Sequence, residues 1–403
     1  MTMLARAIAA LALVFAAWMF WGSRSRDDVF RAPIARLATK HPWMVVGAMG
    51  LGIMIVAAAV VISGVIPVRA SSGHWAITSA LLDFAKTRSV ATYSWASTAP
   101  RLDDESLVLR GAGHYDVACA SCHGGPATRI APTVAASTPP PPDLIPRLAR
   151  WTPEQLFTIV KHGIKFTGMP AWPAQQRDDE VWAMVAFLQR LPQLDATAYR
   201  RLTGDEPTET SAQVGLPNPG EKAPQVVRDL CWRCHGVDGI GKGKGAFPSI
   251  AGQRAEYLLG SLRAFRDKER FSATMSEVAA KLSDKDMSEI AAYFAALPSK
   301  GAETVADSVS VARGRTIAAA GFPDRDIPRC AECHGPSEVP KNPAYPLLAA
   351  QDAAYLTSQL VLLQERRRGG TPNVELMHVF VNRLGRGEIL DVARYFASMP
   401  PDR

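Results

Sequence analysis

Two long apolar runs lie in the amino-terminal part of the chain. Residues 7–22 form the first, and residues 43–66 form a second that contains no charged side chain. A helix of the second run's length crosses a bilayer. Arg and Lys outnumber Asp in the loop between the runs, which places that loop on the cytoplasmic side. We therefore expect a helical hairpin anchor over residues 1–66, a juxtamembrane segment over residues 67–100, and all later residues outside.

The first apolar run is compatible with two other structures. It is short for a membrane span, and a signal peptide core or an interfacial helix has a similar length. No small-residue cleavage site follows Trp21, and the basic loop begins directly afterwards. The pattern favours the hairpin and leaves the other two open.

Beyond residue 100, apolar residues recur at helical spacing in three places. Intervals of three and four residues place them on one face of a helix. Asp178, Ser283 and Gly385 stand near the helix starts, and a proline follows each end. These patterns predict an all-α fold. The expected buried stripes are Val181, Met184, Val185 and Leu188; Ile290, Tyr293, Phe294 and Leu297; and Ile389, Val392, Tyr395 and Phe396.

All six cysteines belong to three copies of the pattern Cys-x-x-Cys-His. This pattern is typical of covalent haem c attachment, in which both thiols become thioethers and the imidazole binds the iron. Structural zinc is the alternative, but tetrahedral zinc needs four ligands and each copy offers three. A stapling disulfide is disfavoured because no cysteine remains to pair elsewhere. The predicted attachment residues are Cys119, Cys122, Cys231, Cys234, Cys330 and Cys333, and the predicted proximal ligands are His123, His235 and His334.

The haem motifs recur in three units that are too long for solenoid repeats. Each unit has a motif, a proline-containing loop, a methionine and an amphipathic helix, which predicts three small domains with separate cores. The polar, Pro- and Gly-rich segment 204–221 reads as a linker. The expected boundaries are residues 101–203, 222–299 and 300–403 for the three domains.

Each domain offers a methionine as the second axial ligand. A thioether favours reduced iron and so raises the reduction potential. Met169 lies in the tight turn Gly-Met-Pro, and Met275 and Met377 each precede a leucine by seven residues. The competing ligands are His162 and His378, and the patterns favour methionine in both cases. Three complete ligand sets leave no open iron for a substrate, so we expect an electron carrier and no enzyme.

Two further features concern the haem surroundings. The proximal imidazole is usually oriented by a backbone carbonyl that accepts from its other ring nitrogen. Pro142, Pro248 and Pro346 follow the motifs at suitable places and are the candidates. The run Arg366 to Arg368 is interpreted as a solvated charge cluster, with pairing to haem propionates as the alternative.

With these residues in view, all three units resemble class I c-type cytochromes over about residues 105–400. The last two are similar to the dihaem cytochrome c4 family, on CWRCHGVDGIGKGKGAFPSIAGQRAEYLLGSL and its counterpart YPLLAAQDAAYLTSQL. The resemblance implies that an opening helix crosses the closing helix at a small residue. Gly111 and Gly314 suit that contact, and the second unit's opening helix is expected to be short.

The resemblance also implies a function and a location. We expect a membrane-anchored trihaem relay on the periplasmic side of a bacterial inner membrane, between a quinol-oxidising complex and a terminal oxidase. The alternative is a haem subunit of a periplasmic alcohol or aldehyde dehydrogenase, and a peroxidase-type haem enzyme is a third. Residues 1–66 carry much of the formal charge of +7, which leaves no basic surface that favours nucleic acid. Partners are redox proteins and membrane lipid, with no small-molecule substrate.

Overall fold

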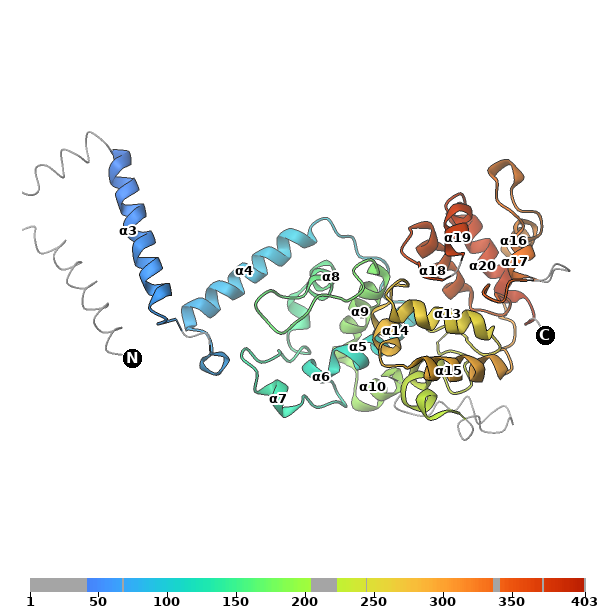
Figure 1. The fold of residues 1–403 in the computed structure, drawn as a ribbon, viewed down its shortest axis with the longest axis horizontal. Helices are drawn as coiled ribbons and strands as arrows, with labels where there is room; N and C mark the ends of the chain where they lie inside the picture. Colours follow the sequence, from blue (N-terminus) through green and yellow to red (C-terminus); the bar gives the residue numbers. More distant parts are fainter. Residues whose placement is uncertain are drawn as a thin grey trace, which may run out of the picture. The chain divides into compact units, whose positions relative to one another are not determined.

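The computed structural model describes residues 42–66, 69–203, 223–243, 245–335, 341–371 and 373–401. The apolar run at 7–22 and the linker at 204–221 lie outside the described residues. The chain divides into two compact units, residues 1–74 and residues 75–403. Helices dominate both (Figure 1), and in the described residues extended backbone pairs only at two isolated bridges. The predicted all-α fold is confirmed.

The first unit contains the helix α3, Pro42–Ile62, followed by the short turn η1, Ala70–Ser72. Many α3 side chains are exposed, among them Trp43 and Ile62. Judged by length and apolar character together, none of the helices in the described part of the chain qualifies as a membrane span. The predicted span over residues 43–66 is therefore without structural support.

The second unit holds all three haem motifs. We call residues 101–203 the first repeat, residues 223–299 the second and residues 300–401 the third. The helix α4, Ala76–Ser94, comes before them and packs on the first repeat through Val90. The first repeat consists of α5 (Glu105–Ala118), α6 (Ala120–His123), α7 (Pro132–Ala135), η2 (Leu148–Arg150), α8 (Pro153–His162), α9 (Asp178–Arg190), η3 (Leu191–Gln193) and α10 (Ala196–Thr203).

The second and third repeats have matching orders of helices. The second consists of the π-helical turn η5 (Val227–Cys231), α12 (Trp232–His235), α13 (Ala255–Arg266), α14 (Ala273–Ala279) and α15 (Asp284–Ala296). The third consists of α16 (Ser308–Ala320), η6 (Pro323–Arg325), α17 (Cys330–His334), α18 (Ala353–Gln364), α19 (Val374–Val381) and α20 (Arg386–Ser398). The expected short opening of the second repeat is confirmed, because η5 stands where α5 and α16 stand in the others.

The closing helices begin where the capping residues predict. Asp178 is the first residue of α9, and the Ser283 hydroxyl accepts from the Asp286 amide at the start of α15. The Glu388 carboxylate accepts from the Gly385 amide at the start of α20. Such contacts satisfy amide groups that the first helical turn leaves without partners. The predicted stripes are buried or half-buried, with Tyr293, Leu297 and Tyr395 as the half-buried members.

The opening and closing helices cross at glycine in the first and third repeats. A Cβ atom on Gly111 of α5 would lie 2.0 Å from the Ala183 carbonyl oxygen of α9. A Cβ atom on Gly314 of α16 would lie 2.0 Å from the Asp391 carbonyl oxygen of α20. Only a residue without a side chain permits so close a helix contact. The predicted role of both glycines is confirmed.

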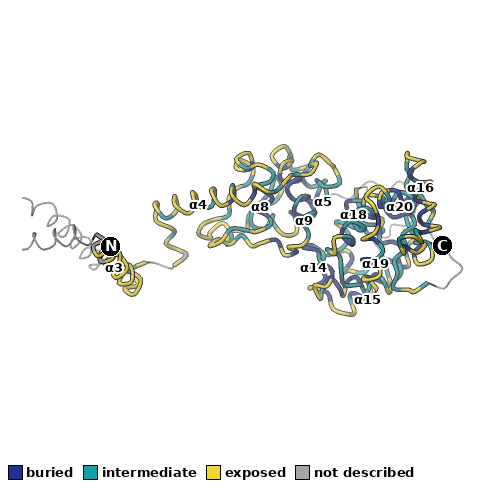
Figure 2. Tube along the Cα trace, turned by 90° about the horizontal axis from the view of Figure 1, so that it is seen from above, coloured by how far each residue is buried: buried dark blue, intermediate teal, exposed yellow. Residues whose placement is uncertain are grey.

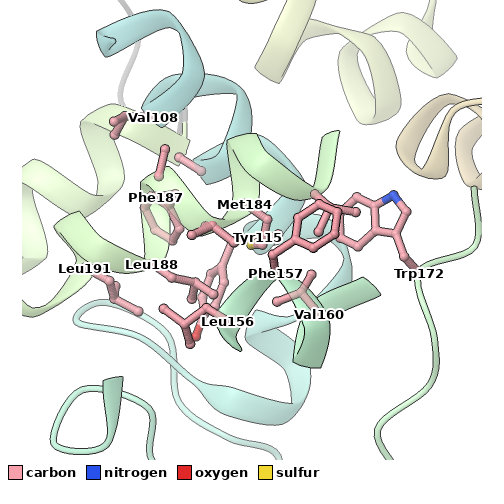
Figure 3. Close-up of a cluster of buried hydrophobic side chains, with 14 of the residues drawn as sticks. Val108, Tyr115, Leu156, Phe157, Val160, Trp172, Met184, Phe187, Leu188 and Leu191 are labelled. Atoms are coloured by element: carbon pink, nitrogen blue, oxygen red, sulfur yellow. The ribbon is translucent and has the colours of Figure 1, made fainter. Parts of the chain in front are cut away.

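The core of the first repeat lies where α5, α8 and α9 meet. Figure 3 shows Tyr115 of α5 beside Phe187 and Met184 of α9, with Phe157 of α8 on the same cluster. The Tyr115 and Phe187 ring centroids are 5.1 Å apart, and the Tyr115 hydroxyl donates to the Gly124 carbonyl at 2.7 Å. That bond ties the residue after the first motif to the core. Buried positions follow these helices along the trace (Figure 2).

Candidate haem sites

Each Cys-x-x-Cys-His motif occupies a short helical turn, in α6, at η5 and α12, and in α17. One helical turn brings residues three apart to one face, so both thiols of a motif lie on the same side. All six cysteines are free, and no disulfide joins them. In the described residues no cluster of three or more His, Cys, Asp or Glu forms a metal site. The zinc alternative therefore gains no support from the geometry.

Burial raises the pKa of four of the six motif thiols to about 11 or 12. It raises the pKa of Cys119 and of Cys231 to about 12. It also raises the pKa of Cys234 and of Cys330 to about 11. A thiol of this kind is a poor nucleophile in its own right. These four cysteines are therefore poor candidates for a catalytic nucleophile.

The three motif histidines make the same hydrogen bond. In each, the ring atom Nδ1 donates to the carbonyl oxygen of a later proline, which leaves the Nε2 lone pair for a metal. Burial lowers the pKa of His235 and of His334, so both stay neutral, the form that binds iron. The prediction of the proline carbonyls is confirmed. The pairs are His123–Pro142 at 3.1 Å, His235–Pro248 at 3.1 Å and His334–Pro346 at 3.0 Å.

Residues of the second and third repeats form most of the lining of one shared cavity of about 390 Å³. His235 and Met275 of the second repeat line it, as do His334 and Met377 of the third. The cysteines of both motifs also face it. The rest of the lining is largely apolar and includes Leu258, Phe265, Phe294, Leu356, Leu363 and Phe396. The cavity thus gathers two of the three predicted sets of attachment and ligand residues.

Two arginines give this cavity a positive charge. Arg270 donates to the Ser261 hydroxyl at 3.0 Å, and Arg368 donates to the Tyr257 hydroxyl at 2.8 Å. Burial alone would raise the pKa of Tyr257, but Arg368 and Arg270 lower it to about 7. Among the described residues neither arginine pairs with a carboxylate, and the buried Arg368 Nε has no partner. Buried cations are expected to have an anion nearby.

Those two arginines bear on whether the cavity fits haem. Each haem carries two propionates, which are anions of the kind that Arg270 and Arg368 lack. The apolar lining suits the porphyrin, and the paired thiols, imidazoles and methionines suit its attachment and ligation. The residues therefore fit the group. The interpretation of Arg366 to Arg368 as a solvated run is wrong for Arg368, which faces the cavity.

The structure separates Met377 from its rival His378. The His378 ring is buried, and its Nε2 atom lies 2.7 Å from the Arg368 carbonyl oxygen. Met377 lines the cavity, and His378 is not part of the lining. The helix α19 thus directs neighbouring side chains to different surroundings, and Met377 is the one that lines the cavity together with His334.

The first repeat holds Met169 in a folded loop. The Ile164 amide donates to the Met169 carbonyl at 3.2 Å, and the Met169 amide donates to the Thr167 hydroxyl at 3.2 Å. Gly163 has φ +65°, and a Cβ there would lie 2.6 Å from the Met169 carbonyl oxygen. The loop therefore folds back on the end of α8. His162, the rival, is exposed at that helix end.

The first repeat also contributes to the shared cavity, which the sequence did not reveal. Arg110, His114, Arg177 and Glu180 line it, and all come from α5 or the start of α9. The sequence singled out only Asp178 at the start of α9, as a sign of a helix terminus. No local pattern marks residues that meet a segment 93 positions later, as Glu180 meets Ala273.

Family models match two parts of the chain. Residues 106–188 match cytochrome c oxidase, cbb3-type, subunit III, and residues 220–298 match cytochrome c. With the helical fold and the histidine-bearing motifs, these matches define a multihaem c-type cytochrome, an electron carrier with covalently bound haem c.

Similarity to individual proteins identifies a family within the multihaem c-type cytochromes. The chain is 32% identical over 178 residues to cytochrome c4 of Pseudomonas aeruginosa, which covers 44% of this chain and 87% of that protein. It is 33% identical over 171 residues to the thiosulfate dehydrogenase electron acceptor of Thiomonas intermedia, which covers 42% of this chain and 78% of that protein. The chain belongs to the cytochrome c4 family. A crystal structure of cytochrome c4 from Pseudomonas stutzeri aligns with a TM-score of 0.40 and 29% identity, over 45% of this chain and 96% of that chain.

Proposed function

We propose that the protein is a trihaem electron relay. Each haem is attached through one motif and has a histidine and a methionine as axial ligands. The haems supply reversible one-electron chemistry, and the chain supplies attachment, two ligands for each iron and buried cations. The proposed ligand pairs are His123 and Met169, His235 and Met275, and His334 and Met377.

The shared cavity is the observation that carries this proposal. Two ligand sets face one enclosed space, so the groups that they hold are neighbours and exchange electrons readily. The first repeat adjoins the second through α5, which leads directly into the first motif at Cys119. A Cβ on Gly113 of α5 would lie 3.7 Å from Cys234 Sγ, and Arg233 pairs with Asp116 at 2.6 Å. These contacts support transfer in the order first, second, third repeat or the reverse.

The haem count and the ligands are tested together. Mass spectrometry of the purified full chain should show three covalent haems, and a redox titration followed by absorbance should show the sulfur-to-iron charge-transfer band for each. Two haems, or a site without methionine ligation, would contradict the relay. Rapid carbon monoxide binding to a full equivalent of one reduced haem would instead favour an enzyme with an open iron.

For the partner, we propose a respiratory chain that ends at a terminal oxidase. The match of residues 106–188 to a cbb3-type oxidase subunit supports this direction. A dehydrogenase subunit is the second candidate, because the relatives from Thiomonas intermedia and Stutzerimonas stutzeri are named as electron acceptors of thiosulfate dehydrogenase. Purification in mild detergent separates the two: an accompanying oxidase supports the first, and an accompanying dehydrogenase supports the second.

We also propose that the amino-terminal part attaches the protein to the bacterial inner membrane, with the repeats in the periplasm. The support is the uncharged sequence of α3 and its exposed apolar side chains, such as Trp43, Ile53 and Ile62. Covalent haem attachment agrees with a periplasmic location. Membrane fractionation of the full chain tests this, and recovery entirely in the soluble fraction would contradict it.

A further inference from the structure

Met275 lies in the first turn of α14. Side chains of the first repeat hold residues 271–274, which lead into Met275 and are here called the Met275 loop. Arg177 Nη1 donates to the Phe271 carbonyl at 2.6 Å. Glu180 Oε2 accepts from the Ala273 amide at 2.9 Å. Arg177 and Glu180 both lie at the start of α9, and both form hydrogen bonds with backbone atoms within four residues of Met275.

A third contact follows at the next residue. The His114 Nδ1 atom of α5 is hydrogen-bonded to the Thr274 hydroxyl, directly before Met275. The edge of the His114 ring meets Trp172 with centroids 5.4 Å apart, which fixes the ring in place. His114 and Thr274 both line the shared cavity next to Met275. Phe271, Ala273 and Thr274 are therefore all hydrogen-bonded to side chains of the first repeat.

Glu180, one of the three side chains that hold the Met275 loop, is itself buried and paired. Glu180 is 2% exposed, its Oε1 lies 3.1 Å from Arg177 Nη1, and its Oε2 accepts from Trp172 at 3.3 Å. A buried carboxylate with this many partners is costly to disturb, because removing one partner leaves the others unsatisfied. The arrangement is rigid, and rigidity is what a weak axial ligand needs from the loop that carries it.

The loop before Met377 in the third repeat is held differently. The Val374 amide donates to the Thr371 carbonyl, and the Leu376 amide donates to the Asn373 carbonyl. Glu375, two residues before Met377, pairs at 3.4 Å with Arg366 and is exposed. These contacts all lie within the third repeat. Arg367 of the third repeat also pairs with Asp178 of the first repeat at 3.3 Å, but it lies ten residues before Met377. Contacts from the first repeat to the residues directly before the methionine therefore distinguish the Met275 loop.

We propose that the first repeat positions the axial methionine of the second haem site, with Glu180 and His114 as positioning residues. The proposal rests on the proposed function, in which Met275 is an iron ligand. The first repeat then has two roles, because it carries its own haem and it sets the ligand strength at the next one. Loosening the loop weakens the sulfur–iron bond, which lowers the reduction potential at that site and opens it to added ligands.

The test compares Glu180→Ala and His114→Ala with the wild-type full chain. Each variant should lower the potential of one haem of the three and weaken its charge-transfer band. The rate of carbon monoxide binding to that haem should rise about tenfold or more, as expected for the loss of a buried hydrogen bond. Glu180→Gln keeps an oxygen acceptor for the Ala273 amide and should restore much of the wild-type behaviour. Glu105→Ala is the matched control, because it removes an exposed glutamate of the first repeat that pairs with Arg190 at 3.1 Å, and it should change neither potential nor ligand binding.

Met275→Ala separates failure of this inference from failure of the proposed function. If Met275→Ala leaves every haem spectrum unchanged, the proposed ligand set is wrong. If Met275→Ala exposes one haem while folded Glu180→Ala and His114→Ala proteins keep wild-type potentials and carbon monoxide rates, only the positioning role is wrong. Circular dichroism and the thermal midpoint establish folding, and the two variants act at separate atoms, so one unfolded variant leaves the other as the test.

Discussion

Gln253 and Gln351 make the same pair of hydrogen bonds in opposite directions across the two cavity-forming repeats. The Gln253 amide donates to the Leu347 carbonyl at 3.0 Å and accepts from the Leu347 amide at 2.9 Å. Gln351 donates to the Ser249 carbonyl at 2.7 Å and accepts from the Ser249 amide at 3.1 Å. Each glutamine side chain thus satisfies the backbone N–H and C=O of one residue in the other repeat. The exchange joins the two walls of the cavity.

Replacing either glutamine by leucine should destabilise the second unit. Gln253→Leu removes three hydrogen bonds, two with the Leu347 backbone and one from the Arg254 amide. The part-buried N–H and C=O of Leu347 lose their partner, which costs about 2 kcal/mol. Gln351→Leu should cost about the same. The free energy of unfolding, measured by denaturant titration, gives the comparison. Gln225→Leu, at an exposed position, is the control and should have little effect.

The double variant Gln253→Leu/Gln351→Leu tests whether the two glutamines stabilise the same interface between the second and third repeats. If Gln253 and Gln351 hold one interface, their losses should not add, because the first change already loosens what the second would break. Additive losses would show two independent attachments. The reduction potentials of both cavity haems should shift together in either single variant, and a shift confined to one haem would argue against a common wall.

The two helix crossings should be intolerant of even one methyl group. Gly111→Ala and Gly314→Ala each place a carbon 2.0 Å from a backbone carbonyl oxygen, so the helices must separate. We expect a loss of about 3 kcal/mol in each. Gly387→Ala is the control, since no atom lies within 4 Å of the added carbon. It should stabilise the exposed start of α20 by about 1 kcal/mol. Thermal unfolding of the three variants tests this.

The family resemblance, and not spacing alone, predicted these crossings. Gly111 and Gly314 each precede a motif, and the resemblance supplies the contact that a small residue permits. The proline carbonyls at 142, 248 and 346 were predictable from the local sequence, since each follows its histidine by 12 to 19 residues. A contact between residues close in sequence, such as that between a motif histidine and the following proline, can be predicted from the local sequence.

Contacts between repeats could not be predicted in this way. Arg368 looked like part of a solvated run, and Arg366 in the same run is indeed exposed. Only the fold places Arg368 beside Tyr257, 111 positions away, in an enclosed space. The sequence also did not single out Glu180, which the fold places against the Ala273 amide. Burial depends on which surfaces meet, and one sequence does not record that.

The choice between Met377 and His378 has its own test. Met377→Ala should expose one haem to carbon monoxide and lower its potential, because a thioether ligand is lost. His378→Ala should keep the sulfur-to-iron band and instead lower stability by about 1 kcal/mol, since the buried ring loses its bond to the Arg368 carbonyl. Absorbance and denaturant titration of the two variants distinguish them. Loss of the band in His378→Ala alone would reverse the assignment.

The buried His114 should make the stability of the second unit depend on pH. Burial lowers the pKa of His114 from 6.5 to about 4, so its imidazole stays neutral in the folded protein. Between pH 6.5 and about 4 the unfolded chain therefore binds a proton that the folded chain does not. Stability falls as the pH falls through that window, by up to about 3 kcal/mol from this group.

His114→Gln removes that titration. Its unfolding free energy should decline less than that of the wild type between pH 6.5 and pH 4, whatever its value at neutral pH. The guanidinium of Arg177 holds the pKa of Asp179 at about 2 against its burial, so that carboxylate loses its contribution only at lower pH, below 3.8. His162→Gln changes an exposed histidine and should follow the wild-type curve. Parallel curves for wild type and His114→Gln would show that protonation of His114 does not oppose folding.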